Sequence, residues 1–199
     1  MGGSIEKVVQ DRRSWYAIND QSPVTDEQIR GIVDFALLHV PSAFNSQSTR
    51  LVLLLKEHHK KFWDIVMNAL RAVVPPEKFA PSEQKINSFA AGYGTILYYE
   101  DQKVVEDLQS RFPGYAKNFP AWSQQTSAMH QIVIWMMLED AGLGASLQHY
   151  NPLVDEETRR VWSLDPAWTL VGQMPFGGRV KAPDAKEFHS PDERRKFFG

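Results

Sequence analysis

QQTSAMHQIVIWMMLEDA, residues 124–141, is the most apolar helical segment of the chain. The apolar side chains of Met129 and of residues 132–138 fall on nearly every side of such a helix, and a helix with this pattern is buried over most of its surface. The apolar run is too short for a membrane span, which needs about 20 such residues. We therefore expect a helix at the centre of the core or of a dimer interface, and no association with a membrane.

Outward from this helix, short apolar runs alternate irregularly with amphipathic helices. Gly142-Leu143-Gly144 is typical of a helix end, and Thr25 with Gln28 forms a capping box that starts another helix. We expect strands at residues 51–55, 94–99, 146–150 and 168–174, and helices at residues 4–10, 25–40, 58–74, 82–91, 104–112 and 155–162. Strands separated by helices of unequal length indicate an α+β fold.

Composition excludes several classes of function. The chain has 199 residues, which predicts a single domain over residues 1–199. Its formal net charge of -2 argues against nucleic acid or anionic membrane as a partner. With no cysteine and six dispersed histidines, we expect no disulfide, thiolate nucleophile or metal site. The N-terminal residues contain no apolar signal segment, so we expect a cytoplasmic protein. Any demanding chemistry must then come from ordinary side chains or from an organic cofactor.

Two short motifs suggest phosphate binding. Arg12-Arg13-Ser14 offers two guanidinium groups and a hydroxyl, which match phosphate oxygens. Taken alone, this triplet is more often a solvated basic pair at the surface. Gly177-Gly178-Arg179 follows an apolar strand, and glycines let the backbone approach a ligand closely. The alternative for this second motif is an ordinary turn at the end of the strand.

The loop PSAFNSQ, residues 41–47, concentrates polar groups after an apolar helix. Its carboxamides, on Asn45 and Gln47, both donate and accept hydrogen bonds. Together with the hydroxyls of Ser42 and Ser46 they suit a planar heterocycle that presents carbonyl groups and ring nitrogens. An ordinary capping loop before the next strand is an equally good interpretation of these residues.

In this order, the four segments resemble the nitroreductase family of flavin enzymes, and together with Gln148-His149-Tyr150-Asn151 they look most like its Frm2/Hbn1-like branch. The segments are Arg12-Arg13-Ser14, residues 41–47, Gly142-Leu143-Gly144 and Arg179. The resemblance implies a central, mainly antiparallel sheet flanked by helices. It also implies an intertwined homodimer with FMN at the subunit interface, in which the helix at residues 124–141 forms interface core and the C-terminal tail wraps the partner.

The same resemblance assigns roles to individual residues. Cofactor-binding residues would be Arg12, Ser14 and Arg179 at the FMN phosphate, Arg13 beside them, Ser42, Asn45 and Gln47 at the ring and ribityl chain from the other subunit, and Gln148 and His149 at the ring edge with N5 and O4. Tyr16 stands where many relatives have Lys or Arg beside N1 and O2 of the ring. Arg50 or Lys181 could supply that missing cation.

The resemblance further implies an NAD(P)H oxidoreductase. NADH or NADPH would reduce flavin N5, and a nitroaromatic or quinone acceptor would then take the electrons in a ping-pong sequence, with no catalytic side chain and no metal. One alternative is a non-catalytic flavin-binding regulatory or stress-signalling protein of the Frm2-like type. Others are a different flavin reaction, such as dehalogenation or ring fragmentation, and a structural α+β protein with coincidental motifs.

Overall fold

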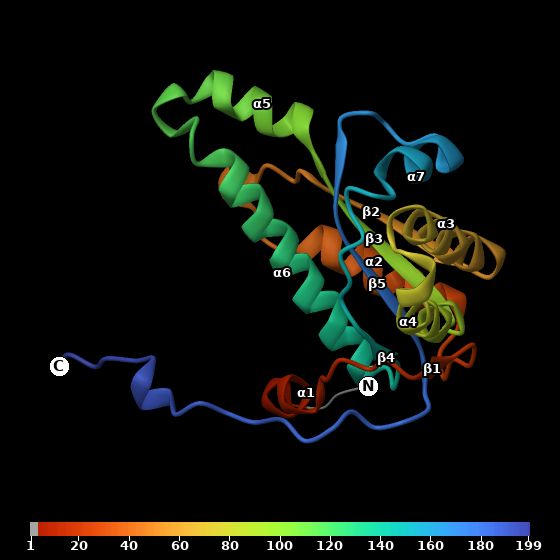
Figure 1. The fold of residues 1–199 in the computed structure, drawn as a ribbon. Coiled ribbons are helices and arrows are strands. Elements are labelled where there is room, and N and C mark those ends of the chain that lie inside the picture. Colours follow the sequence, from red (N-terminus) through yellow and green to blue (C-terminus); the bar gives the residue numbers. More distant parts are fainter. Residues whose placement is uncertain (1–3) are drawn as a thin grey trace.

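An antiparallel sheet forms the centre of the fold, with strand order β1-β5-β3-β2 and β4 paired to β5 (Figure 1). The structure is a computed structural model that describes residues 4–199. Residues 1–3 lie outside the described part; they belong to the N-terminal segment from which a cytoplasmic location was expected. The strands are β1 Ile18–Asn19, β2 Thr49–Leu55, β3 Gly94–Asp101, β4 Gly144–Ala145 and β5 Trp168–Arg179.

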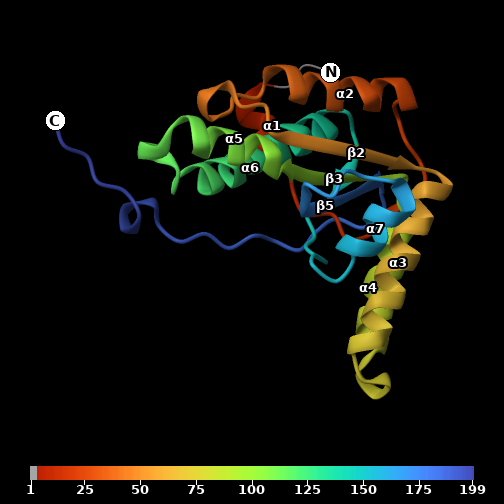
Figure 2. The same ribbon diagram turned by 90° about the horizontal axis from the view of Figure 1, so that it is seen from above.

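Helices cover both faces of the sheet, with α2, α5 and α6 on one side and α3, α4 and α7 on the other (Figure 2). They are α1 Ile5–Asp11, α2 Asp26–His39, α3 Glu57–Val73, α4 Ala80–Ala90, α5 Gln102–Arg111, α6 Phe119–Asp140 and α7 Asp155–Trp162. Short 3-10 turns lie at Ala43–Asn45, Pro76–Lys78, Pro113–Tyr115 and Pro191–Glu193. The expected α+β architecture with an antiparallel sheet flanked by helices is therefore confirmed.

The two faces of β3 build two separate cores. Ile96 and Tyr98 pack on the α2 and α6 side, whereas Leu97 and Tyr99 pack on the α3 and α4 side. Successive side chains of a strand point to opposite faces, so the consecutive apolar residues 96–99 of β3 need cover on both faces of the sheet. β3 is therefore an inner strand of the sheet with a helical layer on each face.

Local signals place several helix ends. At the start of α2, the Thr25 hydroxyl accepts from Gln28 N and the Gln28 side chain accepts from Thr25 N, as the capping box requires. After α6, Gly142 has a φ of 83° and Leu143 N donates to Leu138 O over 2.9 Å. Glycine adopts this left-handed backbone without steric cost. Both predicted ends are confirmed.

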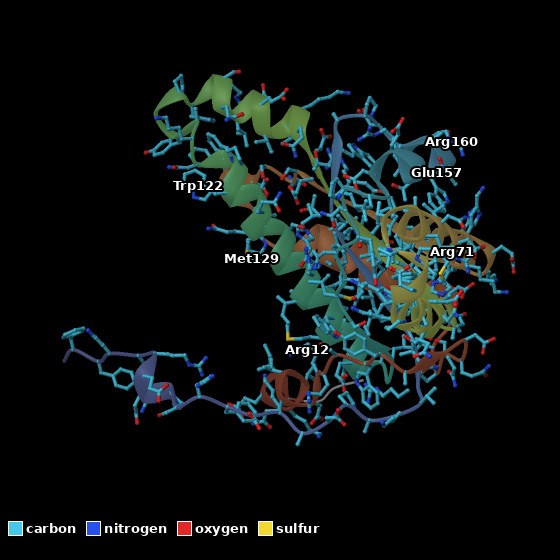
Figure 3. All side chains as sticks on the ribbon, in the orientation of Figure 1. Arg12, Arg71, Trp122, Met129, Glu157 and Arg160 are labelled. Atoms are coloured by element: carbon cyan, nitrogen blue, oxygen red, sulfur yellow. The ribbon has the colours of Figure 1, made fainter. Side chains whose placement is uncertain are left out.

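The long helix α6 is covered on one side only by the described residues. Ile134 and Leu138 are fully buried against the sheet, while Met129 and Ile132 are 36% and 41% exposed. Met129 and Trp122 point away from the sheet (Figure 3). Within one chain α6 is therefore the outer layer and not the centre of the core. No helix of residues 4–199 is long and apolar enough to cross a bilayer.

Two predictions about strands were wrong. Residues 146–150 were expected to form a strand, but the strand is β4 at Gly144–Ala145, followed by a single bridge between Gln148 and Gln173. Regular pairing stops there because Tyr150 N donates to the side-chain Oε1 of Gln173 over 2.7 Å, in place of a backbone carbonyl.

Gly177 and Gly178 lie inside β5 and not in a turn after it. A Cβ at Gly177 would lie 2.2 Å from the carbonyl oxygen of Asn19, so glycine lets β1 approach β5. The two-residue β1 was not expected, because it exists only through this pairing.

Candidate functional site

A cavity of about 480 Å³ lies between the N-terminal segment after α1 and the C-terminal segment after β5. Two hydrogen bonds hold these segments together: Val180 N donates to Ala17 O over 3.1 Å, and the Arg13 guanidinium donates to Asp184 O over 2.6 Å. The lining comprises Arg12, Arg13, Ser14, Tyr16, Ala17, Lys181, Ala182, Pro183, Asp184 and Lys186. Arg12, Arg13, Ser14 and Tyr16 of the predicted site, neighbours in the sequence, thus line one cavity with residues 181–186.

Positive charge dominates this cavity. Arg12, Arg13, Lys181 and Lys186 line it together with one acidic residue, Asp184, whose carbonyl is bound to Arg13. Guanidinium and ammonium groups form charge-assisted hydrogen bonds to phosphate oxygens, and a serine hydroxyl adds a neutral one. The donor set therefore suits a phosphate monoester, which carries two negative charges.

Sequence reasoning did not predict that Lys181 and Lys186 line this cavity. Lys181 was considered only as a cation for the flavin ring, and Lys186 was not considered. Both lie in an extended segment without periodic pattern, about 170 residues after Arg12. The available signal was a pair of lysines in a proline-containing extension, which by itself indicates only a solvated tail.

Arg179 takes a different place from the one expected. Its guanidinium pairs with the buried Glu139 carboxylate over 2.8 Å, donates to the carbonyls of Glu139 and Leu143, and lies 5.2 Å from the centre of the Trp15 ring. Arg179 thus joins the last turn of α6 to the segment after it, where Glu139 O also accepts from Gly142 N over 2.9 Å. It is not among the described residues that line the cationic cavity, so its phosphate role stays a prediction.

Replacing Arg179 with methionine is expected to lower the free energy of unfolding by about 2 to 3 kcal/mol, because a buried carboxylate loses its partner. The lower part of the usual range applies because the Arg179 side chain is 29% exposed. Burial already raises the pKa of Glu139, while Arg179 opposes that shift. Denaturant unfolding measures the loss, and an unchanged midpoint would contradict it. A selective loss of affinity for FMN over riboflavin would support the predicted phosphate role.

The polar loop has an unusual backbone. Phe44, Asn45 and Gln47 have φ values of 56°, 51° and 50°. This is the left-handed region of the backbone, which residues other than glycine adopt at a cost of about 1 to 3 kcal/mol each. The Ser42 hydroxyl accepts from Gln47 N over 3.0 Å, and the Arg50 guanidinium donates to Gln47 O over 2.7 Å. The surrounding contacts must therefore stabilise the loop.

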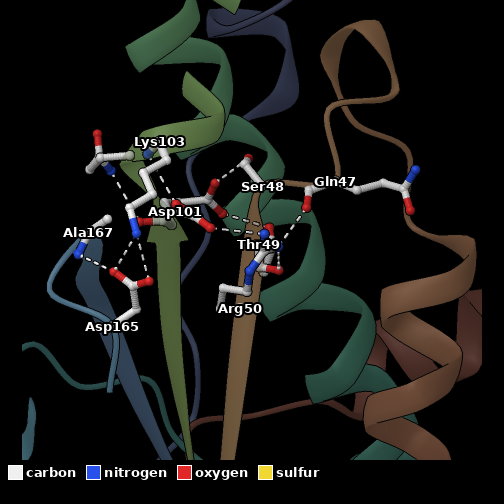
Figure 4. Close-up of polar contacts among 10 residues, drawn as sticks. Gln47, Ser48, Thr49, Arg50, Asp101, Lys103, Asp165 and Ala167 are labelled. Carbon is white, nitrogen blue, oxygen red and sulfur yellow. Dashed lines mark hydrogen bonds and ion pairs between the residues drawn. The ribbon is translucent and has the colours of Figure 1, made fainter. Parts of the chain in front are cut away.

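Buried polar groups anchor the loop where it enters β2. The Glu100 carboxylate is fully buried and accepts from the hydroxyls of Ser48 and Thr49 over 2.5 and 2.6 Å. Arg50 pairs with Asp101 over 3.0 Å, and Figure 4 shows these contacts across β2 and β3. Burial raises the pKa of Glu100, whereas its two hydroxyl donors oppose the shift. Burial also lowers the pKa of His130, whose Nδ1 lies 3.3 Å from Thr49 Oγ1.

Aromatic packing anchors the tip of the same loop. The Phe44 ring lies with its centroid 4.8 to 6.1 Å from four rings of the α5–α6 region: Phe112, Tyr115, Phe119 and Trp122. Aromatic pairs in this range contribute about 0.5 to 1.5 kcal/mol each beyond the area they bury. The connection between α5 and α6 thus holds the strained backbone of residues 44–47.

Ser42 and Gln47 line a second cavity of about 350 Å³, which also includes Arg50, His130 and Trp168. Asn45 is not among its described lining residues. None of the residues lining the cationic cavity lines this one. Figure 1 shows the loop beside the N-terminal half of α6 and α1 beside its C-terminal half. The two halves of the predicted site therefore do not meet within one chain.

The remaining predicted residues differ in burial and in the cavity to which they belong. Gln148 is buried, with its backbone bonded to Gln173 in both directions, whereas His149 is exposed. Tyr16 is half-exposed, and Lys85 Nζ lies 5.7 Å from the centre of its ring. Lys181 shares the cavity with Tyr16, while Arg50 belongs to the other cavity. Sequence reasoning missed Lys85, which α4 brings beside Tyr16 from 69 residues away in the chain.

Among residues 4–199, no group of three or more His, Asp or Glu is placed to hold a metal ion.

The chain matches the model of the nitroreductase family over residues 9–178. It is 32% identical to nitroreductase FRM2 of Saccharomyces cerevisiae over 94% of this chain and 93% of that protein.

Solved structures are similar over nearly the whole chain. Nitroreductase CinD from Lactococcus lactis, in complexes with chloramphenicol and with 4-nitrophenol, is 38% identical with a TM-score of 0.90, covering 98% of this chain and 100% of CinD. A nitroreductase with bound FMN from Desulfitobacterium hafniense shares the fold at 14% identity, with a TM-score of 0.70 and coverage of 100% and 99%.

Proposed function

This chain belongs to the nitroreductase family, and we propose that it is an FMN-dependent NAD(P)H oxidoreductase that reduces nitroaromatic or quinone-type acceptors. The observation that carries the proposal is the cationic cavity, in which Arg12, Arg13, Ser14, Lys181 and Lys186 converge. Its volume of about 480 Å³ lies within the range of small-molecule sites. The donor chemistry and the size both fit the phosphate end of FMN.

Bound FMN would supply the redox chemistry, accepting a hydride at N5 from NADH or NADPH and passing the electrons to the acceptor in a ping-pong sequence. The residues of this chain would bind and orient. Arg12, Arg13, Lys181 and Lys186 would neutralise the phosphate, with a hydrogen bond from Ser14. Gln148 and His149 would flank the N5 side of the ring. Lys85 and Lys181 would supply positive charge near Tyr16, the position at which many relatives have Lys or Arg.

A homodimer follows from the same proposal. Ser42, Asn45 and Gln47 would reach the FMN ring of the other subunit, because the loop and the cationic cavity lie at opposite halves of α6. Apolar side chains on α2 and α6 support this arrangement: Phe35, Leu38, Met129 and Ile132 are all exposed in the single chain, Leu38 by 77%. Residues 1–199 would form one cytoplasmic domain, and its tail would wrap the partner.

The acceptor class is supported by CinD, which binds chloramphenicol and 4-nitrophenol in its solved complexes. Both compounds carry a nitroaromatic group. We extend this class to the present chain because the identity of 38% covers nearly the whole of both proteins. Quinones share with nitroaromatics a planar, electron-poor ring that can stack on flavin.

The purified protein is expected to be yellow, with flavin absorption that co-elutes through gel filtration. Anaerobic titration with NADH and with NADPH should bleach this absorption, and 4-nitrophenol, chloramphenicol or a quinone should restore it. A colourless protein that FMN does not reconstitute would contradict the proposal. A yellow protein that no pyridine nucleotide reduces would instead favour the non-catalytic, Frm2-like regulatory function.

A further inference from the structure

The guanidinium of Arg12 lies over the indole ring of Trp135, with Cζ 4.4 Å from the ring centroid. Arg12 is the first residue after α1, and Trp135 belongs to the C-terminal half of α6. Figure 3 shows Arg12 beside this part of α6. Guanidinium planes stack on aromatic faces, and tryptophan provides the strongest cation–π contact. The stack therefore restricts a long, flexible side chain to one region.

We propose that Trp135 is a positioning residue for the phosphate of the cofactor and acts through Arg12. This inference rests on the proposed function. Stacking occupies a face of the guanidinium, while its N–H donors project from the edge of the same plane. The edge of Arg12 thus stays available for bidentate binding of phosphate oxygens at the cationic cavity, which Arg12 lines.

The surroundings of Trp135 favour a role toward Arg12 over a purely local one. The indole Nε1 of Trp135 is buried and has no hydrogen-bond partner among residues 4–199. The orientation of the ring is therefore not set by a hydrogen bond to another described residue. The ring is carried by α6, which packs on the sheet through Ile134 and Leu138. A rigid platform under Arg12 reduces the entropy lost when phosphate binds.

The partners of Arg13 and Lys186 differ in kind from the partner of Arg12. Arg13 is bonded to the Asp184 carbonyl, and Lys186 lies 5.1 Å from the ring of the exposed Phe188. Both of these contacts are made by the extended C-terminal segment. The ring partner of Arg12 belongs to α6, a helix that packs on the sheet. Trp135 can therefore fix the position of the Arg12 guanidinium, and of a phosphate bound to it, relative to the sheet.

The first test compares FMN with riboflavin, which lacks the phosphate. Trp135→Leu is expected to raise the FMN dissociation constant about 3- to 10-fold, as loss of one partly buried cation–π contact implies. Riboflavin affinity should change less than about twofold. Trp162→Leu on α7 is the matched control. Trp162 bonds to His58 and packs in the core on the α3 and α4 side of the sheet, away from Trp135, so it should alter neither affinity.

A double-mutant cycle with Arg12→Ala separates positioning from general packing. In the Arg12→Ala background, Trp135→Leu should change FMN affinity less than about twofold. Trp135→Phe keeps an aromatic face, so it should give an intermediate loss of FMN affinity, and it provides a folded variant if leucine unfolds the protein.

Equal losses for FMN and riboflavin, or additive effects of the two substitutions, would overturn the role of Trp135. If the wild-type protein binds FMN and Trp135→Leu leaves its FMN affinity unchanged, this inference is overturned and the proposed function stands. If the wild-type protein binds neither flavin, the proposed function falls and the inference falls with it.

Discussion

Replacing Arg12 with alanine is expected to raise the FMN dissociation constant about 10- to 100-fold. A hydrogen bond to a charged group contributes about 1.5 to 3 kcal/mol, and each 1.4 kcal/mol is a tenfold change in affinity. Arg12 lines the cationic cavity and lies on Trp135, so its charge and its orientation would both be lost. Flavin fluorescence during titration of the apoprotein measures the change.

Arg111→Ala is the control for this substitution. Arg111 lies on α5, is 61% exposed, and pairs with Asp107 one helical turn away over 3.1 Å. Such surface pairs contribute only a few tenths of a kcal/mol. Riboflavin affinity should be little affected in either variant, because the missing interaction is with phosphate. Equal retention of FMN by the two variants would remove Arg12 from the phosphate site.

Gly177→Ala is expected to lower the free energy of unfolding by about 3 kcal/mol, toward the upper end of the usual cost of overpacking. The added Cβ would lie 2.2 Å from Asn19 O and 2.9 Å from Tyr93 N, and backbone atoms cannot move aside as a flexible side-chain end can. β1 must then separate from β5. Because Ala17 and Val180 join the two segments that flank the cavity, FMN retention should fall as well.

Gly31→Ala is the matched control for Gly177→Ala. Gly31 is an exposed residue within α2, and a Cβ there would meet no atom within 4 Å. Alanine is favoured over glycine inside a helix by about 0.5 to 1 kcal/mol. Gly31→Ala should therefore stabilise the protein slightly. Urea unfolding of the two variants measures the contrast, and a Gly177→Ala variant as stable as the wild type would contradict the proposed close pairing of β1 and β5.

Elements with local determinants were predicted well from sequence. The capping box at Thr25 and Gln28 places the start of α2, and Gly142 places the end of α6. The apolar run at residues 51–55 predicts a strand, and the helical periodicity of residues 58–74 predicts a helix. The structure has β2 and α3 at these places. These signals act through contacts between residues a few positions apart, so they can be read from the chain alone.

Elements that exist through distant partners were predicted poorly. β1 has two residues and depends on pairing with Gly178 and Arg179. The expected strand at residues 146–150 is interrupted because a side chain of β5 takes the backbone donor of Tyr150. No pattern within either segment reports on these contacts, since the partners lie more than 20 residues away.

The candidate site divides in the same manner. Arg12, Arg13, Ser14 and Tyr16 could be proposed from their order and from the resemblance to flavin enzymes, and the structure brings them together. Lys181, Lys186 and Lys85 required the fold, because a lone lysine carries no sequence signal. Arg179 also required the fold: its phosphate role stays a prediction, while the structure shows its guanidinium bonded to the carbonyls of Glu139 and Leu143.

By itself, the sequence determined the α+β class, the long apolar helix and the absence of any chemistry that needs cysteine, because composition and periodicity are properties of the chain. Only the tertiary structure decided which cations share a cavity, that Arg12 lies on Trp135, and that the polar loop is held by Glu100 and an aromatic cluster. These arrangements join residues from distant segments, and their geometry is set by how the helices pack on the sheet.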